Sequence, residues 1–220
     1  MSSTKRGGQR SPSDNYPTPK WCVHRFLKEY IPRVQSLTSG ASRWLEPGAG
    51  EGNLVRAVNE YWPEGQYHWH LCEIRESCKP ILENLGKVER VTIGSFLDYP
   101  EDPEDIDGGY DVSISNPPFS IAMEFIEKSM EIASSTAMLQ RLNFVGSAKR
   151  HEFMKKHKPD IYVIPNRPSF KATGETDSIE YAWFVFDAFS KGRWELLDLT
   201  PVDVRKAEHK ALVDLGYLHG

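Results

Sequence analysis

Cysteine is scarce in this chain of 220 residues, which holds only Cys22, Cys72 and Cys78. Their number is odd and their spacing fits no metal-ligand pattern, so the sequence favours neither a disulfide framework nor a cysteine-held metal. We predict three reduced, mostly buried thiols and no metal site.

Long apolar runs are also missing, although hydrophobic residues make up 39% of the chain. No run is long enough to cross a bilayer. The N-terminus lacks the charged segment followed by an apolar one that marks a secretory leader. We therefore expect a cytoplasmic protein without a membrane partner. The length suits one α/β domain with a substantial core.

An excess of positive charge is lacking, since the formal net charge is −4. Binding to nucleic-acid phosphates is driven by cation release and would favour the opposite sign. The charges are unevenly spread, however, with acidic residues crowded at 101–107 and basic ones gathered at 149–151, 155–158 and 167–171. A cationic face is therefore compatible with the overall sign. The solvated side of a helix explains the run at 149–158 equally well.

Strand and helix patterns alternate along most of the chain. Residues 1–14 lack apolar periodicity and are predicted to be a disordered tail, with residues 15–220 forming a single domain. Strands are predicted at 43–46, 67–73, 89–93, 110–115, 137–145, 160–164 and 181–187. Helices are predicted at 21–30, 53–61, 77–85, 120–133, 147–157 and 202–215, the first ending before Pro32. This alternation predicts an α/β fold with one doubly wound, mostly parallel sheet that binds ligands at the carboxyl ends of its strands.

The sequence Asn116-Pro117-Pro118-Phe119 follows directly after the predicted strand 110–115. Both prolines fix their own φ and bias the preceding residue towards an extended backbone. The Asn116 side-chain oxygen and the Pro117 carbonyl can thus be held as two acceptors beneath the Phe119 ring. Such a rim suits a flat, conjugated molecule that carries an NH2 group. An isolated match of this kind would more simply be a turn with a packed aromatic ring.

A second motif, Glu46-Pro47-Gly48-Ala49-Gly50-Glu51-Gly52, leads from one predicted strand into a helix. Glycines there permit positive φ and the close approach of a ligand. Turns of this type often hold a dinucleotide pyrophosphate. Here Glu46 and Glu51 bracket the turn and would repel phosphate, so the pattern favours a cationic ligand. A purely structural glycine turn is the simpler alternative.

Together the two motifs resemble motifs I and IV of the S-adenosylmethionine-dependent amino-methyltransferases, particularly the DNA N6-adenine group. The segment 15–19 resembles the cofactor-contacting segment of that group and implies contacts from Tyr16, Thr18 and Pro19. Its place ahead of motif I resembles the gamma order of motifs. Segments 166–170 and 177–186 are similar to the end of the catalytic half in small phage-type enzymes. The resemblance covers roughly residues 15 to 187 and implies a Rossmann-like class I methyltransferase fold.

The resemblance also implies roles for the cofactor residues. Gly48, Gly50, Gly52 and Glu46 would form the S-adenosylmethionine turn, and Asn116 would contact both cofactor and substrate. Glu73 ends the second predicted strand, where an acid can accept from ribose hydroxyls. Asp98 is similar to the family residue that accepts from the adenine amino group, although Asp before Tyr-Pro also suits a turn.

Substrate residues follow from the same resemblance. Asn116 and Pro117 would accept the two N–H protons of an adenine N6, with Pro118 shaping the rim and no covalent intermediate. A flipped base would stack on Phe119, with Phe170 as the opposite wall or an ordinary core aromatic. The resemblance also places Arg167 near the substrate. Lys149 and Arg150 are predicted from the basic run at 149–158, as residues that would hold a substrate by its phosphates. Cytosine C5 methylation is set aside, since the chain has no Pro-Cys pair.

The sequence departs from sequence-specific DNA methyltransferases in one respect. About fifty residues separate the 116–119 motif from the 167–170 segment, too few for a large target-recognition domain. Recognition is then short and relaxed, or a protein partner provides it, or the substrate is not duplex DNA. Relaxed DNA adenine methylation in a bacterial or phage-infected cell is the favoured function. Methylation of RNA adenine or of a protein glutamine, and a non-catalytic binding module, stay as alternatives.

Overall fold

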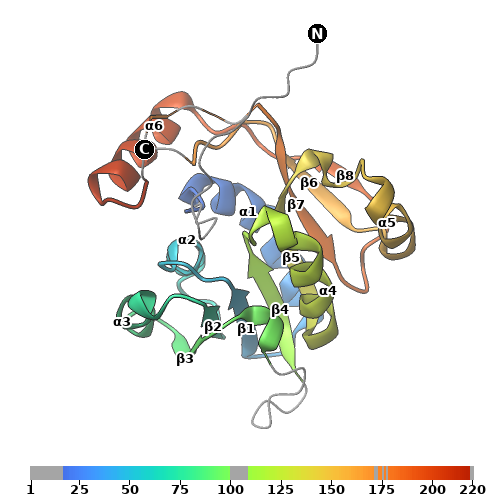
Figure 1. The fold of residues 1–220 in the computed structure, drawn as a ribbon, viewed down its shortest axis with the longest axis horizontal. Coiled ribbons are helices and arrows are strands. Elements are labelled where there is room, and N and C mark those ends of the chain that lie inside the picture. Colours follow the sequence, from blue (N-terminus) through green and yellow to red (C-terminus); the bar gives the residue numbers. More distant parts are fainter. Residues whose placement is uncertain (1–16, 100–108, 171–172, 175, 177, 219–220) are drawn as a thin grey trace.

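The computed structural model describes residues 17–99, 109–170, 173–174, 176, 178 and 179–218. Its helices are α1 (Lys20–Leu37), α2 (Asn53–Tyr61), α3 (Lys79–Glu83), α4 (Ala122–Ile132), α5 (His151–His157) and α6 (Val202–Asp214). Its strands are β1 (Ser42–Pro47), β2 (Tyr67–Glu73), β3 (Val88–Ile93), β4 (Tyr110–Ser115), β5 (Ala133–Arg141), β6 (Asp160–Ile164), β7 (Tyr181–Phe186) and β8 (Trp194–Leu196). Figure 1 shows their arrangement.

All the strands lie in one mixed sheet with the order β3-β2-β1-β4-β5-β7-β6-β8. The strands β3, β2, β1, β4 and β5 are mutually parallel, and only β7 runs antiparallel to its neighbours. The predicted α/β fold with a mostly parallel sheet is confirmed. Strand order reverses beside β1, between β2 and β4, which is where open α/β sheets bind their ligands.

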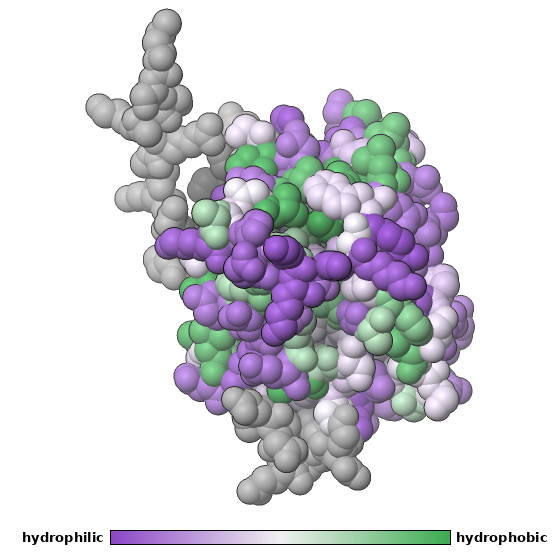
Figure 2. Space-filling view, turned by 90° about the vertical axis from the view of Figure 1, so that its right-hand side faces the viewer, coloured by the Kyte–Doolittle hydropathy of each residue, from purple (hydrophilic) through white to green (hydrophobic). Residues whose placement is uncertain are grey.

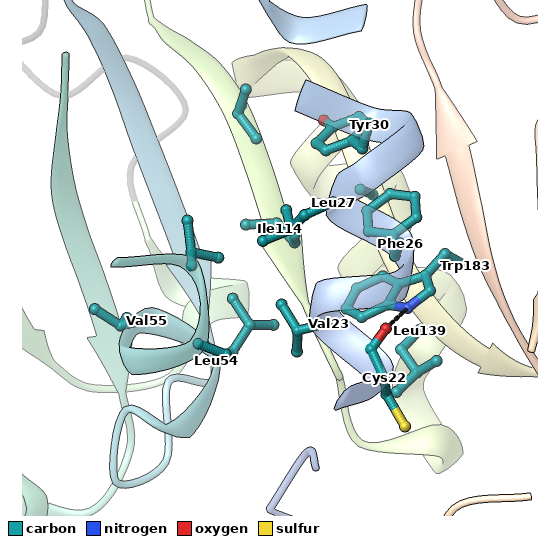
Figure 3. Packing of buried hydrophobic residues seen from close by; sticks show 14 of the residues in the cluster. Cys22, Val23, Phe26, Leu27, Tyr30, Leu54, Val55, Ile114, Leu139 and Trp183 are labelled. Atoms are coloured by element: carbon teal, nitrogen blue, oxygen red, sulfur yellow. Dashed lines mark hydrogen bonds between the residues drawn. The ribbon is translucent and has the colours of Figure 1, made fainter. Parts of the chain in front are cut away.

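Helices cover both faces of the sheet, as in a doubly wound fold. The largest core cluster joins α1, α2 and α3 to one face, and two smaller clusters join α4 and α5 to the other. On the first face the rings of Phe26 and Trp183 stack at 4.6 Å between centroids. Figure 3 shows this contact and the hydrogen bond from Trp183 Nε1 to the Cys22 carbonyl.

Helix α1 runs through Pro32 instead of ending before it, so the predicted boundary at Tyr30 is wrong. An internal proline costs a helix about 3 kcal/mol because it removes one hydrogen bond and crowds the preceding turn. Beyond Tyr30, the helix buries Ile31 and Val34, and burying such a side chain contributes about 1.5–3 kcal/mol. Burial of these two residues therefore offsets the proline.

Several other boundaries differ from the prediction. Strand β5 begins and ends four residues earlier than 137–145. It ends early because Leu142–Phe144 form a 3₁₀ turn, whose first N–H donates to the Glu180 carbonyl. Strand β8 was not predicted, since its three residues are all exposed and show no burial alternation. Each of the seven predicted strands is nevertheless present.

The described helices include none long and apolar enough to span a membrane. The side of the molecule that carries β8 and α5 faces the viewer in Figure 2 and shows mostly hydrophilic side chains with small apolar patches between them.

A buried ion cluster joins α1 to β6 and β7 at the end of the sheet where β6 begins. The Arg33 guanidinium donates to Asp160 at 2.7 Å and forms an ion pair with Asp187. All three side chains are less than a tenth exposed. Arg193, which is 63% exposed, also binds Asp160.

Removing Arg33 should strongly destabilise the protein. Arg33→Met leaves two buried carboxylates without their shared cation, and breaking a buried pair in this way costs about 3–5 kcal/mol. Arg193→Met removes only an exposed partner of Asp160 and should cost about 1 kcal/mol or less. Urea unfolding of the two variants measures the difference. Equal losses would show that Arg33 has no special role in the cluster.

Candidate functional site

A cleft opens where β1, β2, β3 and β4 end. Its lining includes Pro17, Thr18, Glu46, Gly48, Ala49, Gly50, Glu51, Glu73, Arg75, Ser95, Phe96, Asn116, Pro118 and Phe125. Residues from both sequence motifs therefore meet in one hollow. The reason is topological: β1 and β4 are neighbours in the sheet, so the turns at their carboxyl ends lie side by side.

The glycine turn is pinned to the end of β2. The N–H groups of Gly48 and Ala49 both donate to the Cys72 carbonyl, at 2.8 and 3.0 Å. Gly48 and Gly50 have φ of 73° and 58°, so both need the left-handed backbone that glycine adopts without strain. Both line the cleft.

Gly52, which was also predicted to contact the cofactor, is placed differently from Gly48 and Gly50. It is buried at the N-cap of α2 and is not among the described residues that line the cleft. A Cβ there would stand 2.3 Å from Leu85 Cδ1 and 3.2 Å from Leu82 Cδ2. The absence of a side chain is therefore explained by the packing of α2 against α3.

Glu73 holds the turn from the other side. Its Oε2 accepts from the Gly50 N–H at 2.6 Å, and its Oε1 accepts from Arg75 N at 3.0 Å and Arg75 Nε at 2.8 Å. An ionised carboxylate offers about four acceptor positions. One position is thus left for a ligand hydroxyl without any rearrangement. Arg75 was not predicted, because nothing in the sequence shows that its side chain turns back onto Glu73.

Glu46 lies beside Glu73 and is only 3% exposed. Its Oε2 has no hydrogen-bond partner among the described residues. Burial, and then the nearby charge of Glu73, raise the pKa of Glu46 well above its ordinary value, and a hydrogen bond from the Val55 backbone offsets this in part. A buried carboxyl in this situation favours a cationic partner.

The 116–119 motif forms the rim on the β4 side. Asn116 and Pro118 line the cleft, whereas Pro117 is buried next to them. Ser115, the last residue of β4, donates from its hydroxyl to the Pro47 carbonyl at the end of β1. This bond ties the rim directly to the glycine turn.

Three aromatic rings continue from the rim. The Phe119 ring lies 5.8 Å from that of Tyr181, which lies 5.2 Å from that of Phe170. The Arg141 guanidinium stands 4.9 Å from the centre of the Phe119 ring. Phe119 and Phe170 thus come to the same region, with Tyr181 between them. Neither Tyr181 nor Arg141 was a predicted site residue, since the strand pattern gives them only a sheet position.

Other predicted residues are placed less favourably. Asp98 is exposed on a 3₁₀ turn and does not line the cleft; Ser95 and Phe96 of the same turn do. Thr18 lines the cleft and Pro19 is the N-cap of α1. Tyr16 and the acidic segment 101–107 lie outside the described residues.

The predicted substrate cations are partly engaged elsewhere. Arg150 Nε donates to the Phe144 carbonyl at 2.8 Å, and its guanidinium covers the Phe144 ring at 4.2 Å. Arg167 forms an ion pair with Glu180. Lys149 is exposed. No group of three or more metal-ligating side chains occurs in the described part of the chain.

The fold is that of class I methyltransferases. A candidate class I S-adenosylmethionine-dependent methyltransferase from Listeria monocytogenes matches with a TM-score of 0.61 and 15% identity, over 93% of this chain and 72% of that one. A candidate RNA methyltransferase from Pyrococcus horikoshii matches with a TM-score of 0.56 and 16% identity, over 86% of this chain and 94% of that one.

A third solved structure is the methyltransferase subunit of a type I restriction–modification system from Streptococcus thermophilus. It matches with a TM-score of 0.62 and 12% identity, over 92% of this chain and 58% of that one. No protein-family model and no curated protein matches this sequence. At these identities the likeness concerns the fold alone.

The raised pKa of Glu46 gives a stability prediction. A carboxyl whose pKa is raised on folding stabilises the protein at low pH, and that stability is lost as the pH rises through the folded-state pKa. Glu46→Gln cannot ionise, so the variant should gain stability relative to the wild type as the pH is raised above the ordinary carboxyl range.

Urea unfolding across pH tests this, with Glu64→Gln at an exposed position as the control. If the curves of wild type and Glu46→Gln run parallel, Glu46 ionises without cost and the cleft has no need of a cation.

Proposed function

We propose that the protein is an S-adenosylmethionine-dependent methyltransferase that modifies the exocyclic N6 of adenine in DNA with relaxed sequence specificity. One observation carries the proposal. The Asn116 rim, suited to an amino group, and the buried Glu46–Glu73 pair, suited to a cationic ligand with hydroxyls, open into the same cleft.

The residues of the cleft fit this cofactor. Glu46 is a buried acid, and its Oε2 lacks a hydrogen-bond partner among the described residues. This arrangement favours a cationic ligand. Glu73 retains an acceptor position for a ribose hydroxyl. A Cβ at Gly94 would meet nothing within 4 Å, so there is open space on the β3 side. When bound, S-adenosylmethionine supplies a methyl group that is activated by the positive sulfonium.

The chain's own residues then act on the amine. An adenine N6 is a poor nucleophile because its lone pair is delocalised into the ring. The Asn116 amide oxygen and the Pro117 carbonyl would accept its two N–H groups and favour a tetrahedral nitrogen. The N–C bond would form as the S–C bond of the sulfonium breaks, and one N6 proton would then be lost to solvent. Phe119 holds the face of the base, and positioning with electrostatics provides the rate.

The same rim would serve an RNA adenine or a protein glutamine amide. Structural neighbours of both nucleic-acid kinds, a candidate RNA enzyme and a restriction–modification subunit, are consistent with either substrate. Transfer of tritium from labelled cofactor to duplex DNA, single-stranded DNA, RNA and cell protein, followed by nucleoside analysis, decides among them. N6-methyladenine in many DNA contexts is the expected product. Label confined to one long DNA sequence excludes relaxed specificity, and no transfer to any substrate supports a non-catalytic binding module.

Glu73 should contribute to cofactor affinity. Glu73→Ala loses both the hydroxyl contact and the anchor on Gly50, which should weaken binding by about 1–3 kcal/mol. Glu73→Gln keeps one acceptor oxygen for the Gly50 N–H and should lose less. Calorimetry with S-adenosylmethionine measures both, and unchanged affinity in a folded Glu73→Ala would exclude the ribose assignment.

Asn116 should act mainly in the transition state. Asn116→Ala should lower kcat about 100-fold or more, the scale of losing one preorganised hydrogen bond, while cofactor affinity stays nearly intact. Asn116→Asp keeps an acceptor oxygen and should retain more activity. Steady-state kinetics and calorimetry give the two numbers; turnover near that of wild type in Asn116→Ala would overturn the catalytic assignment.

A further inference from the structure

A second hollow lies next to the cleft, between α6 and the segment that follows β6. Its polar lining consists of Arg167, Ser169, Thr176, Arg205, Lys206 and His209, and its apolar lining includes Trp21 and Leu212. No carboxylate is found among the described residues that line it. Arg205, Lys206 and Arg167 bring three cationic side chains to this groove in a chain with a net charge of −4, although Arg167 is already paired with Glu180.

The packing of α6 explains this excess. The Glu208 carboxylate, adjacent to His209 in the chain, accepts from the backbone N–H groups of Lys20 and Trp21 at the start of α1. Its charge is therefore directed at a helix N-terminus, where it is favourable, instead of at the groove. Arg205 Nε donates to the Thr200 carbonyl at 3.2 Å, and this bond holds the guanidinium at the edge of the groove.

Two chain segments link the groove to the candidate active site. Pro17 and Thr18 line the cleft, and the next residues, Pro19 and Trp21, line the groove. On the other side, Ser169 lines the groove while Phe170 reaches Phe119 through Tyr181. Figure 1 shows α6 near the start of α1, where the Glu208 contacts join the two helices.

We infer that this groove binds the sugar–phosphate backbone of the nucleic-acid strand whose base enters the cleft. The inference rests on the proposed function, which supplies the nucleic-acid substrate. Phosphate oxygens require cations and polar donors without neighbouring carboxylates, and Arg205, Lys206 and Ser169 provide them. Contacts of this kind read no sequence, in agreement with relaxed specificity. Arg150, by contrast, is held by the carbonyl and the ring of Phe144.

Lys206 and Lys210 form a matched pair for the test, because they lie one turn apart on α6. Lys206 lines the groove, whereas Lys210 does not and instead pairs with Asp214 at 3.0 Å. Fluorescence anisotropy would follow the binding of labelled single-stranded DNA and RNA of the same sequence over a series of salt concentrations. Thermal unfolding and cofactor calorimetry verify that each variant is folded.

Lys206→Ala should weaken binding at low salt and reduce the slope of log K against log salt by about 0.7, the value for one single-strand phosphate contact. Lys206→Glu should weaken binding further, and Lys210→Ala should match the wild type. The strand type that binds more tightly identifies the substrate as DNA or RNA. Equal effects at the two lysines, or no effect at Lys206, would overturn the inference. So would tighter, Lys206-dependent binding of polyglutamate, which would indicate an acidic protein partner.

The test separates the two proposals. If Lys206→Ala impairs oligonucleotide binding but the wild type transfers no methyl group to nucleic acid, the groove assignment stands and the proposed function fails. If methyl transfer to DNA proceeds with the same KM in wild type and Lys206→Ala, the function stands and the groove assignment fails.

Discussion

Two carboxylates buried at the ends of adjacent strands are the constraint on which the site depends. Glu46 and Glu73 are 3% and 5% exposed and repel one another. Glu73 accepts hydrogen bonds from the N–H groups of Gly50 and Arg75 and from the Arg75 guanidinium. Glu46 accepts fewer hydrogen bonds than Glu73, and burial raises its pKa. A positively charged ligand beside Glu46, at the carboxyl ends of the parallel strands, would therefore be favoured.

The same hydrogen bonds also shape the cleft. The glycine turn is fixed by the Cys72 carbonyl on one side and the Glu73 carboxylate on the other. Ser115 then connects the end of β4 to the end of β1. A ligand in the cleft and a group on the Asn116 rim would thus be positioned by one connected framework. Such preorganisation is what a reaction without a covalent intermediate requires.

Helices α1 and α6, which are far apart in the sequence, meet beside the site. Helix α1 begins just after Thr18 in the cleft, and the Glu208 carboxylate of α6 caps that beginning across 188 positions of sequence. This contact directs the one acid of that turn away from the groove beside the cleft. If the groove binds the substrate, α6 would affect both the substrate affinity and the position of the first turn of α1.

The sequence by itself determined the α/β alternation, the presence of every central strand and the two motifs at strand ends, because these follow from local periodicity and from residues with restricted backbones. It did not determine the bounds of β5, which begins and ends four residues earlier than predicted. The sequence also showed that the turn needs glycines, but it did not show why each is there. Only the packing distinguishes Gly50, which lines the cleft, from Gly52, where a side chain would collide with Leu85. The passage of α1 through Pro32 depends on burial of Ile31 and Val34. Only the tertiary structure decided how Arg75, Tyr181 and Lys206 are placed and that Asp98 is exposed. Each of these depends on the direction of a side chain relative to other parts of the fold, which local sequence patterns do not encode.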